Sequence, residues 1–177
     1  MKRFTSIAIV LVLLVCSLVA CGGTQAETPA AYEGSIAELV TKLYETKPLE
    51  LPVFTEGMSV DLTDADALMA YTGLESADGI AEAVFSETMM GSQAYSLVIV
   101  KLSDAAKAEE IKSGMFNGIN TRKWICVEAD QLRVVSAADL VMLVMADSQL
   151  GEGIADGMVE AFKTNVGELT GETLTKG

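Results

Sequence analysis

The stretch "AYSLVIVKL", residues 94–102, is apolar at both odd and even positions, and "LVMLVMA", residues 140–146, has the same character. Successive side chains of a β-strand point to opposite faces of a sheet, so each stretch predicts a strand that is buried on both sides. A sheet tolerates such strands only at its centre and only when both faces are covered. The two stretches therefore predict a sheet that lies between two layers.

The segments on either side of these stretches complete a repeated plan. Residues 80–87 are separated from the first stretch by "MMGSQ", residues 89–93, and this arrangement predicts a β-hairpin. Residues 132–136 stand before the second stretch in the same way. Apolar residues at helical spacing follow each pair, within residues 104–119 and 154–166. The chain therefore reads as two β-β-α units without obvious residue identity between them.

Two more helices are expected before the first hairpin. Ser35 and Glu38 have the spacing of a capping box, and Pro48 ends the helix that they begin. The same spacing at residues 63–66 predicts a second, shorter helix that ends at Gly73. We expect an α+β fold with an antiparallel sheet of four or five strands. The two late helices should share one face, with the N-terminal helices on the opposite face.

The N-terminus has the pattern of an exported lipoprotein. Lys2 and Arg3 precede an uncharged run over residues 4–20, which is typical of a secretory signal. "LVAC", residues 18–21, resembles the lipobox of bacterial lipoproteins, in which the cysteine thiol receives a diacylglyceryl group and the peptide is cut just before it. We therefore expect a signal peptide over residues 1–20 and lipidation of Cys21 at the extracytoplasmic face of the cell membrane. The alternative is an uncleaved apolar helix with a chance cysteine.

The remaining chain divides into a tether and one domain. Residues 21–34 are rich in Gly, Thr, Gln, Ala and Pro, which predicts a flexible tether. We expect a single domain over residues 35–170 and a C-terminal tail over residues 171–177. The formal net charge of -13 disfavours nucleic acid and anionic lipid surfaces as partners. The expected partners are the membrane itself, through the diacylglyceryl group on Cys21, and a membrane-proximal protein or a small ligand.

The composition also limits the chemistry. The chain has no histidine, which excludes Ser-His-Asp and Cys-His catalysis and most zinc sites. No other catalytic constellation stands out, so we expect no catalytic residue, no metal site and no cofactor. The 25 acidic residues leave paired carboxylates open, as in glycoside hydrolysis, because the separation of two carboxylates depends on the fold.

The most individual segment is "NTRKWICVEAD", residues 120–130, which holds the only tryptophan. If it is extended, Arg122, Trp124, Cys126 and Glu128 share one face of a strand. With Lys123 they form a candidate binding face, in which the indole would stack on a ligand and Arg122 would hold an anionic group. The structural alternative is a strand whose tryptophan packs under a helix and whose Arg and Glu side chains pair. Cys126 would be a nucleophile in an electropositive setting, or otherwise a small core residue.

Three segments carry a resemblance to a known family: "GLESADGIAEAVFSETMMGS", "AYSLVIVKL" and above all "NTRKWICVEADQL". They resemble the short lipoproteins of clostridial and related Firmicute bacteria that carry domain of unknown function 4358. The resemblance spans about residues 35–165. It implies a lipobox, a Gram-positive envelope and a single domain, but no activity, cofactor or catalytic residue.

The leading functional hypothesis is a lipid-anchored binding or accessory module that holds a partner near the outer face of the membrane. One alternative is an envelope enzyme that uses paired carboxylates, for example on glycans. Another is a structural subunit that completes a membrane complex.

Overall fold

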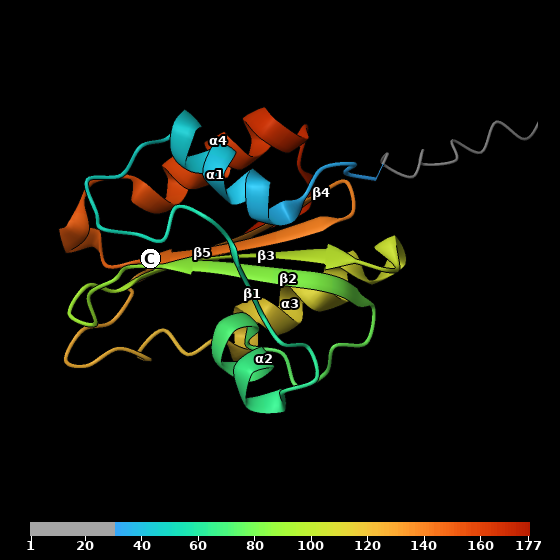
Figure 1. Cartoon of the computed structure of the whole chain (residues 1–177), viewed down its shortest axis with the longest axis horizontal. Coiled ribbons are helices and arrows are strands. Elements are labelled where there is room, and N and C mark those ends of the chain that lie inside the picture. The colour runs from blue at the N-terminus through green and yellow to red at the C-terminus, as the bar shows by residue number, and fades with distance from the viewer. Residues whose placement is uncertain (1–30) are drawn as a thin grey trace, which may run out of the picture.

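The computed structural model describes residues 31–177 as an antiparallel sheet between two layers of helices (Figure 1). The predicted signal peptide, Cys21 and most of the tether lie outside the described residues. The sheet has six strands in the order β1-β2-β3-β5-β4-β6. The strands are β1 (Met58–Ser59), β2 (Ile80–Glu87), β3 (Tyr95–Leu102), β4 (Gln131–Ala137), β5 (Leu140–Ala146) and β6 (Thr170–Lys176). The helices are α1 (Ile36–Thr46), α2 (Ala65–Thr72), α3 (Ala108–Gly118) and α4 (Ile154–Val166), with short 3-10 turns at Ala105–Lys107 and Ser148–Leu150.

The central part of the sheet agrees with the sequence prediction. β3 and β5 lie side by side and antiparallel, with Leu97 opposite Val144 and Ile99 opposite Met142. These side chains are fully buried, because helices cover both faces. The α+β class and the antiparallel sheet are therefore confirmed. The strand count is six rather than four or five, because a short β1 and a C-terminal β6 add the two edges.

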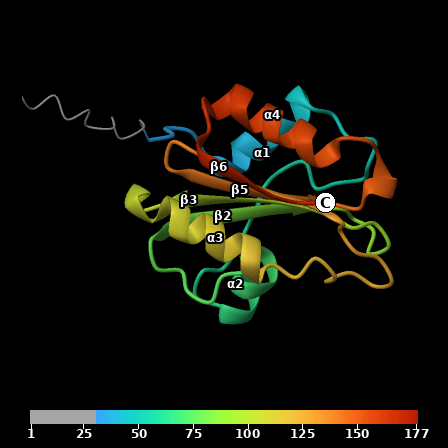
Figure 2. The ribbon, with the colours of Figure 1, turned by 180° about the vertical axis from the view of Figure 1, so that it is seen from behind.

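The helices are distributed over the faces differently from the expectation. α1 and α4 cover one face of the sheet, and α2 and α3 cover the other (Figures 1 and 2). The connections β3-α3-β4 and β5-α4-β6 both join parallel strands, and both step in the same direction across the sheet. They start from strands that run in opposite directions. Crossover connections between parallel strands are strongly preferred to be right-handed. Two right-handed crossovers that start from antiparallel strands place their helices, here α3 and α4, on opposite faces of the sheet.

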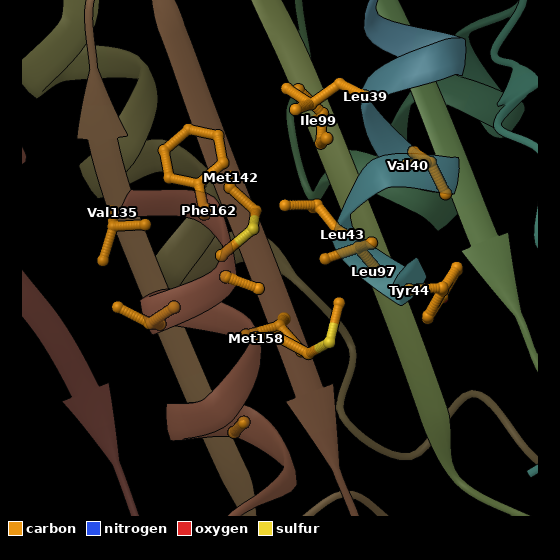
Figure 3. Close-up of a cluster of buried hydrophobic side chains, with 14 of the residues drawn as sticks. Leu39, Val40, Leu43, Tyr44, Leu97, Ile99, Val135, Met142, Met158 and Phe162 are labelled. Atoms are coloured by element: carbon orange, nitrogen blue, oxygen red, sulfur yellow. The ribbon is translucent and has the colours of Figure 1, made fainter. Parts of the chain in front are cut away.

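The two early helices begin and end at local signals. The Ser35 hydroxyl caps α1 by accepting a hydrogen bond from the Glu38 backbone N–H at 3.4 Å. α2 is capped by Asp64 rather than by Thr63, and it ends at Gly73 in the left-handed conformation. α1 buries Leu39 and Leu43 against the central strands, where they meet residues from α4 (Figure 3). Each such side chain contributes about 1.5–3 kcal/mol through burial.

The segment expected as a C-terminal tail is the edge strand β6. It pairs with β4, where Val134 lies opposite Leu174. The fully buried Lys112 donates hydrogen bonds from its ammonium to the Glu172 carbonyl at 2.8 Å and to the Glu109 carboxylate at 2.7 Å. The Arg133 guanidinium donates to the carbonyl of Lys176 at 3.0 Å. These cations hold a strand whose own sequence, "TGETLTK", has little apolar surface to bury.

The two ends of the sheet differ in character. The β2–β3 turn and the segment before β4, residues 88–94 and 119–130, lie at one end, which we call the loop end (left in Figure 1). The described chain starts at the opposite end, which we call the entry end. There the Tyr32 N–H donates to the Asp139 carboxylate at 2.7 Å, and the Tyr32 carbonyl accepts from the Lys101 ammonium at 2.8 Å. Within residues 31–177 no helix is both long and apolar enough to span a bilayer.

Candidate functional site

Residues 119–130 form a loop rather than the predicted strand. The segment lies outside the six-stranded sheet, in which β5 and β6 flank β4. Cys126 has a positive φ of 64°, which breaks the strict alternation of side chains that the prediction of a shared strand face required. A hydrogen bond from the Ala129 N–H to the Thr121 carbonyl at 2.9 Å closes the loop. Ile125 at its tip is 80% exposed.

The loop nevertheless brings together four of the residues that the sequence singled out. Arg122, Trp124, Cys126 and Glu128 line a cavity of about 370 Å³ together with Val127. The Arg122 guanidinium pairs with the Glu128 carboxylate at 2.9 Å, and both side chains are exposed. An exposed pair of this kind contributes only about 0.2–1 kcal/mol, so an anionic ligand can compete with Glu128 for Arg122. The cavity therefore offers an indole, a thiol and an exchangeable cation.

Lys123, the fifth predicted residue, does not line this cavity. Its ammonium pairs with the Glu87 carboxylate and lies 3.4 Å from the Ser96 hydroxyl. It also stands 5.3 Å from the centre of the Tyr71 ring and 5.5 Å from that of Trp124, within the range of cation–π attraction. Burial lowers the pKa of Lys123, while the negative charge of Glu87 acts in the opposite direction. Lys123 thus fastens the loop to β2 and β3 instead of facing solvent.

For Trp124 the structure supports the packing interpretation, and for Cys126 it contradicts the interpretation as a core residue. Trp124 is half-buried and packs against the core on the α2 and α3 face, as the structural alternative expected. Cys126 is exposed, so the interpretation as a core residue is wrong. The sequence did not reveal that Glu87 pairs with Lys123 or that the Tyr71 ring lies beside the Lys123 ammonium. No sequence pattern links either residue to a loop more than thirty positions away.

A larger cavity of about 600 Å³ lies between α3 and the segment that follows α2. Three carboxylate side chains line it, those of Glu75, Asp78 and Glu110. The Lys107 ammonium hydrogen-bonds to Asp78 and holds the pKa of that carboxyl below its usual value. This cavity could not be predicted from the sequence, because two segments that are separate in the chain build it. Among the described residues, no group of three or more His, Cys, Asp or Glu side chains is placed to hold a metal ion.

Comparisons of the chain with protein-family models, with curated proteins and with solved structures found no match. Function is therefore inferred from the geometry of the chain's own residues.

Proposed function

We propose that this protein is a lipid-anchored binding or accessory module at the extracytoplasmic face of the cell membrane, and that it holds a partner through the 119–130 loop. The anchor would be a diacylglyceryl group on Cys21. The observation that carries the proposal is the exposure of Ile125 beside the Arg122–Glu128 cavity, on a loop that is held firmly in place.

The loop is held near its start and at its end. Lys123 pairs with Glu87 on β2. Asp130 accepts hydrogen bonds from the Ser148 N–H at 2.8 Å and from the Ser148 hydroxyl at 2.6 Å. Binding residues are often found on loops that a rigid scaffold positions, because such loops present side chains without a large ordering cost on binding. The fixed, solvent-exposed Ile125 fits a contact that becomes buried in a complex.

The position of the loop supports the same proposal. The loop end lies across the sheet from the entry end, where the described chain starts at Ala31 (Figure 1). A lipid on Cys21 would hold the entry end near the bilayer, so the loop end would face outward. Membership of the lipoprotein family with domain of unknown function 4358 agrees with this arrangement and stays a prediction.

The test is cross-linking and affinity capture of the anchored protein from native membranes. The wild type is compared with Ile125→Glu and with the conservative control Ile125→Val, and Trp124→Ala probes the cavity wall. We expect a stoichiometric partner in the wild type and in Ile125→Val, and its loss in Ile125→Glu. Equal capture by all of these variants would refute the loop as the binding surface. An unchanged mature size and membrane fraction in Cys21→Ser would refute the anchor.

The 600 Å³ cavity favours a second candidate function, an envelope enzyme with paired carboxylates that acts on glycans. Glu75, in the segment after α2, and Glu110, on α3, both line the cavity. Glycoside hydrolysis uses one protonated and one ionised carboxyl group on either side of the scissile bond. Activity of the wild type on cell-wall material, lost in both Glu75→Gln and Glu110→Gln, would support this candidate. An inactive wild type would remove it.

A further inference from the structure

A second pocket lies at the β1 edge of the sheet and is built from residues other than those of the 119–130 loop. It encloses about 340 Å³, and we call it the edge pocket. Its lining is mostly apolar and comes from the segment before and within β1 and from the β2–β3 turn: Val53, Phe54, Thr55, Glu56, Met58 and Met89. Its volume falls near the lower end of the range for ligand pockets, about 300–1,000 Å³.

The edge pocket exists because residues 53–58 leave β2 and then return to it. Val53 forms a bridge with Thr88, and Met58 pairs with Phe85. Between these two points the chain turns towards α1, where the Thr55 carbonyl accepts a hydrogen bond from the Thr41 hydroxyl at 3.1 Å. The space that the departing segment leaves beside the turn is the pocket.

Hydrogen bonds to backbone groups fix the walls of this pocket. The Phe54 N–H donates to the Glu87 carbonyl at 3.0 Å, and the Ser86 hydroxyl donates to the Phe54 carbonyl at 2.6 Å. The Met89 N–H donates to the Pro52 carbonyl at 2.7 Å. A pocket with a preformed backbone costs little conformational entropy when it is filled.

The apolar side chains around the edge pocket are unusually open to water. Phe54 is 38% exposed and Met89 is 60% exposed. Two of the four large hydrophobic side chains that are exposed within residues 31–177 therefore line this one pocket. Methionine is flexible and polarisable, so such a surface adapts to the shape of an apolar partner. The clustering indicates a docking surface rather than scattered surface residues.

We propose that the edge pocket binds an extended segment of another protein that carries one bulky apolar side chain flanked by Lys or Arg. The pocket receives the apolar side chain, and the exposed Glu56 at its rim attracts the basic neighbours. The formal net charge of -13 favours a basic partner and opposes a second copy of the chain. A bilayer is a poor occupant, because the edge pocket lies towards the loop end, away from Ala31. This inference does not depend on the proposed function of the 119–130 loop, but its exclusion of a bilayer rests on the proposed lipid anchor on Cys21.

The test uses the full chain in phospholipid nanodiscs and a synthetic peptide in which one Phe is flanked on each side by Lys residues. Two matched peptides replace the Phe by Ala or the Lys residues by Glu. Binding is followed through the methyl resonances of labelled methionines. We expect the Phe peptide to shift the Met58 and Met89 resonances. Met89→Gln should weaken binding by about tenfold or more, whereas Met90→Gln, a control in the same turn but outside the pocket, should change it by less than about twofold.

Several results would overturn the inference. Equal binding of the Ala peptide would show that the apolar side chain does not contribute, and equal binding of the Glu peptide would show that charge complementarity does not. Equal effects of Met89→Gln and Met90→Gln would show that the edge pocket is not the binding site. The inference also fails if no peptide binds at about 1 mM, or if Met89 instead mediates self-association or binding to lipid vesicles. Ile125→Glu should leave peptide binding unchanged, so this test and the capture experiment fail independently.

Discussion

At the scale of single residues, two glycines of α3 lie very close to the segment that follows α2. A Cβ atom on Gly118 would lie 1.9 Å from the carbonyl oxygen of Gly73, a backbone atom that cannot move away. A Cβ atom on Gly114, one turn earlier in α3, would lie 2.7 Å from the Leu74 Cδ2 atom, the flexible end of a side chain. The two glycines therefore form a matched pair.

We expect Gly118→Ala to lower the free energy of unfolding by about 1–3 kcal/mol, the usual cost of forcing extra atoms into a packed site. Gly114→Ala should be close to neutral, because Ala gains roughly 1 kcal/mol over Gly in helix propensity and this gain offsets the displacement of Leu74. Urea unfolding followed by circular dichroism measures both. Equal losses in the two variants would contradict the close approach of α3 to Gly73.

The half-buried Lys123 gives a prediction about pH. Because burial lowers its pKa in the folded protein, Lys123 should lose its proton below the ordinary value of 10.5. Unfolded chains then hold more protons than folded ones between the two pKa values, so the contribution of Lys123 to stability increases as pH rises through that window. Side-chain NMR of the Lys ε-carbon should show this titration. Glu87→Gln should move it lower still, and an upward shift would be inconsistent with the ion pair.

At the scale of elements, β6 is the strand whose contribution is least obvious from its sequence. Deleting residues 170–177 would take the Glu172 carbonyl from Lys112 and the Lys176 carbonyl from Arg133. We expect a loss of roughly 1.5–3 kcal/mol for each hydrogen bond to a charged group, together with faster hydrogen exchange in β4. Adding Lys112→Met to the shortened chain should recover part of the loss, because it removes the buried charge. An unchanged unfolding midpoint would mean that β6 behaves as a tail.

The elements that the sequence predicted well are those with strong local signals. Residues 80–87 and 140–146 form strands with the predicted bounds, and Gly73 ends α2, because apolar patterning and turn residues act over a few neighbours. β6 was missed because its edge position is supported by Lys112 and Arg133 from other elements. The alternation in residues 120–130 suggested a strand, but the positive φ of Cys126 breaks that alternation, and the local pattern of residue types does not report it.

The candidate site shows the same division between local and distant causes. The sequence identified Arg122, Trp124, Cys126 and Glu128, and the structure gathers them around one cavity, although through a loop. It included Lys123 in the candidate binding face, whereas Glu87 and Ser96 hold its ammonium. The edge pocket was not predicted, because it depends on how Val53 and Met58 return to β2.

At the scale of the whole molecule, the structure separates the surfaces proposed for binding from the end where the chain enters. Ile125 and Met89 lie at the loop end, while Tyr32 is held at the entry end by Asp139 and Lys101. The eight-residue strands β2 and β3 connect the two ends. At about 3.3 Å per residue they separate the ends by roughly 26 Å.

An anchor on Cys21 should therefore keep the loop end farther from the bilayer than the entry end. A fluorophore on Cys126, the only cysteine among residues 31–177, reports the loop end. Ser103→Cys in a Cys126→Ser background places the same fluorophore just after β3, at the entry end. With quenchers on the lipid headgroups we expect stronger quenching at position 103 than at position 126, because energy transfer and contact quenching both fall with distance. Quenching that is equal at the two positions, or stronger at Cys126, would mean that the domain lies with its loop end on the membrane, and neither proposed binding surface would then be free for a protein partner.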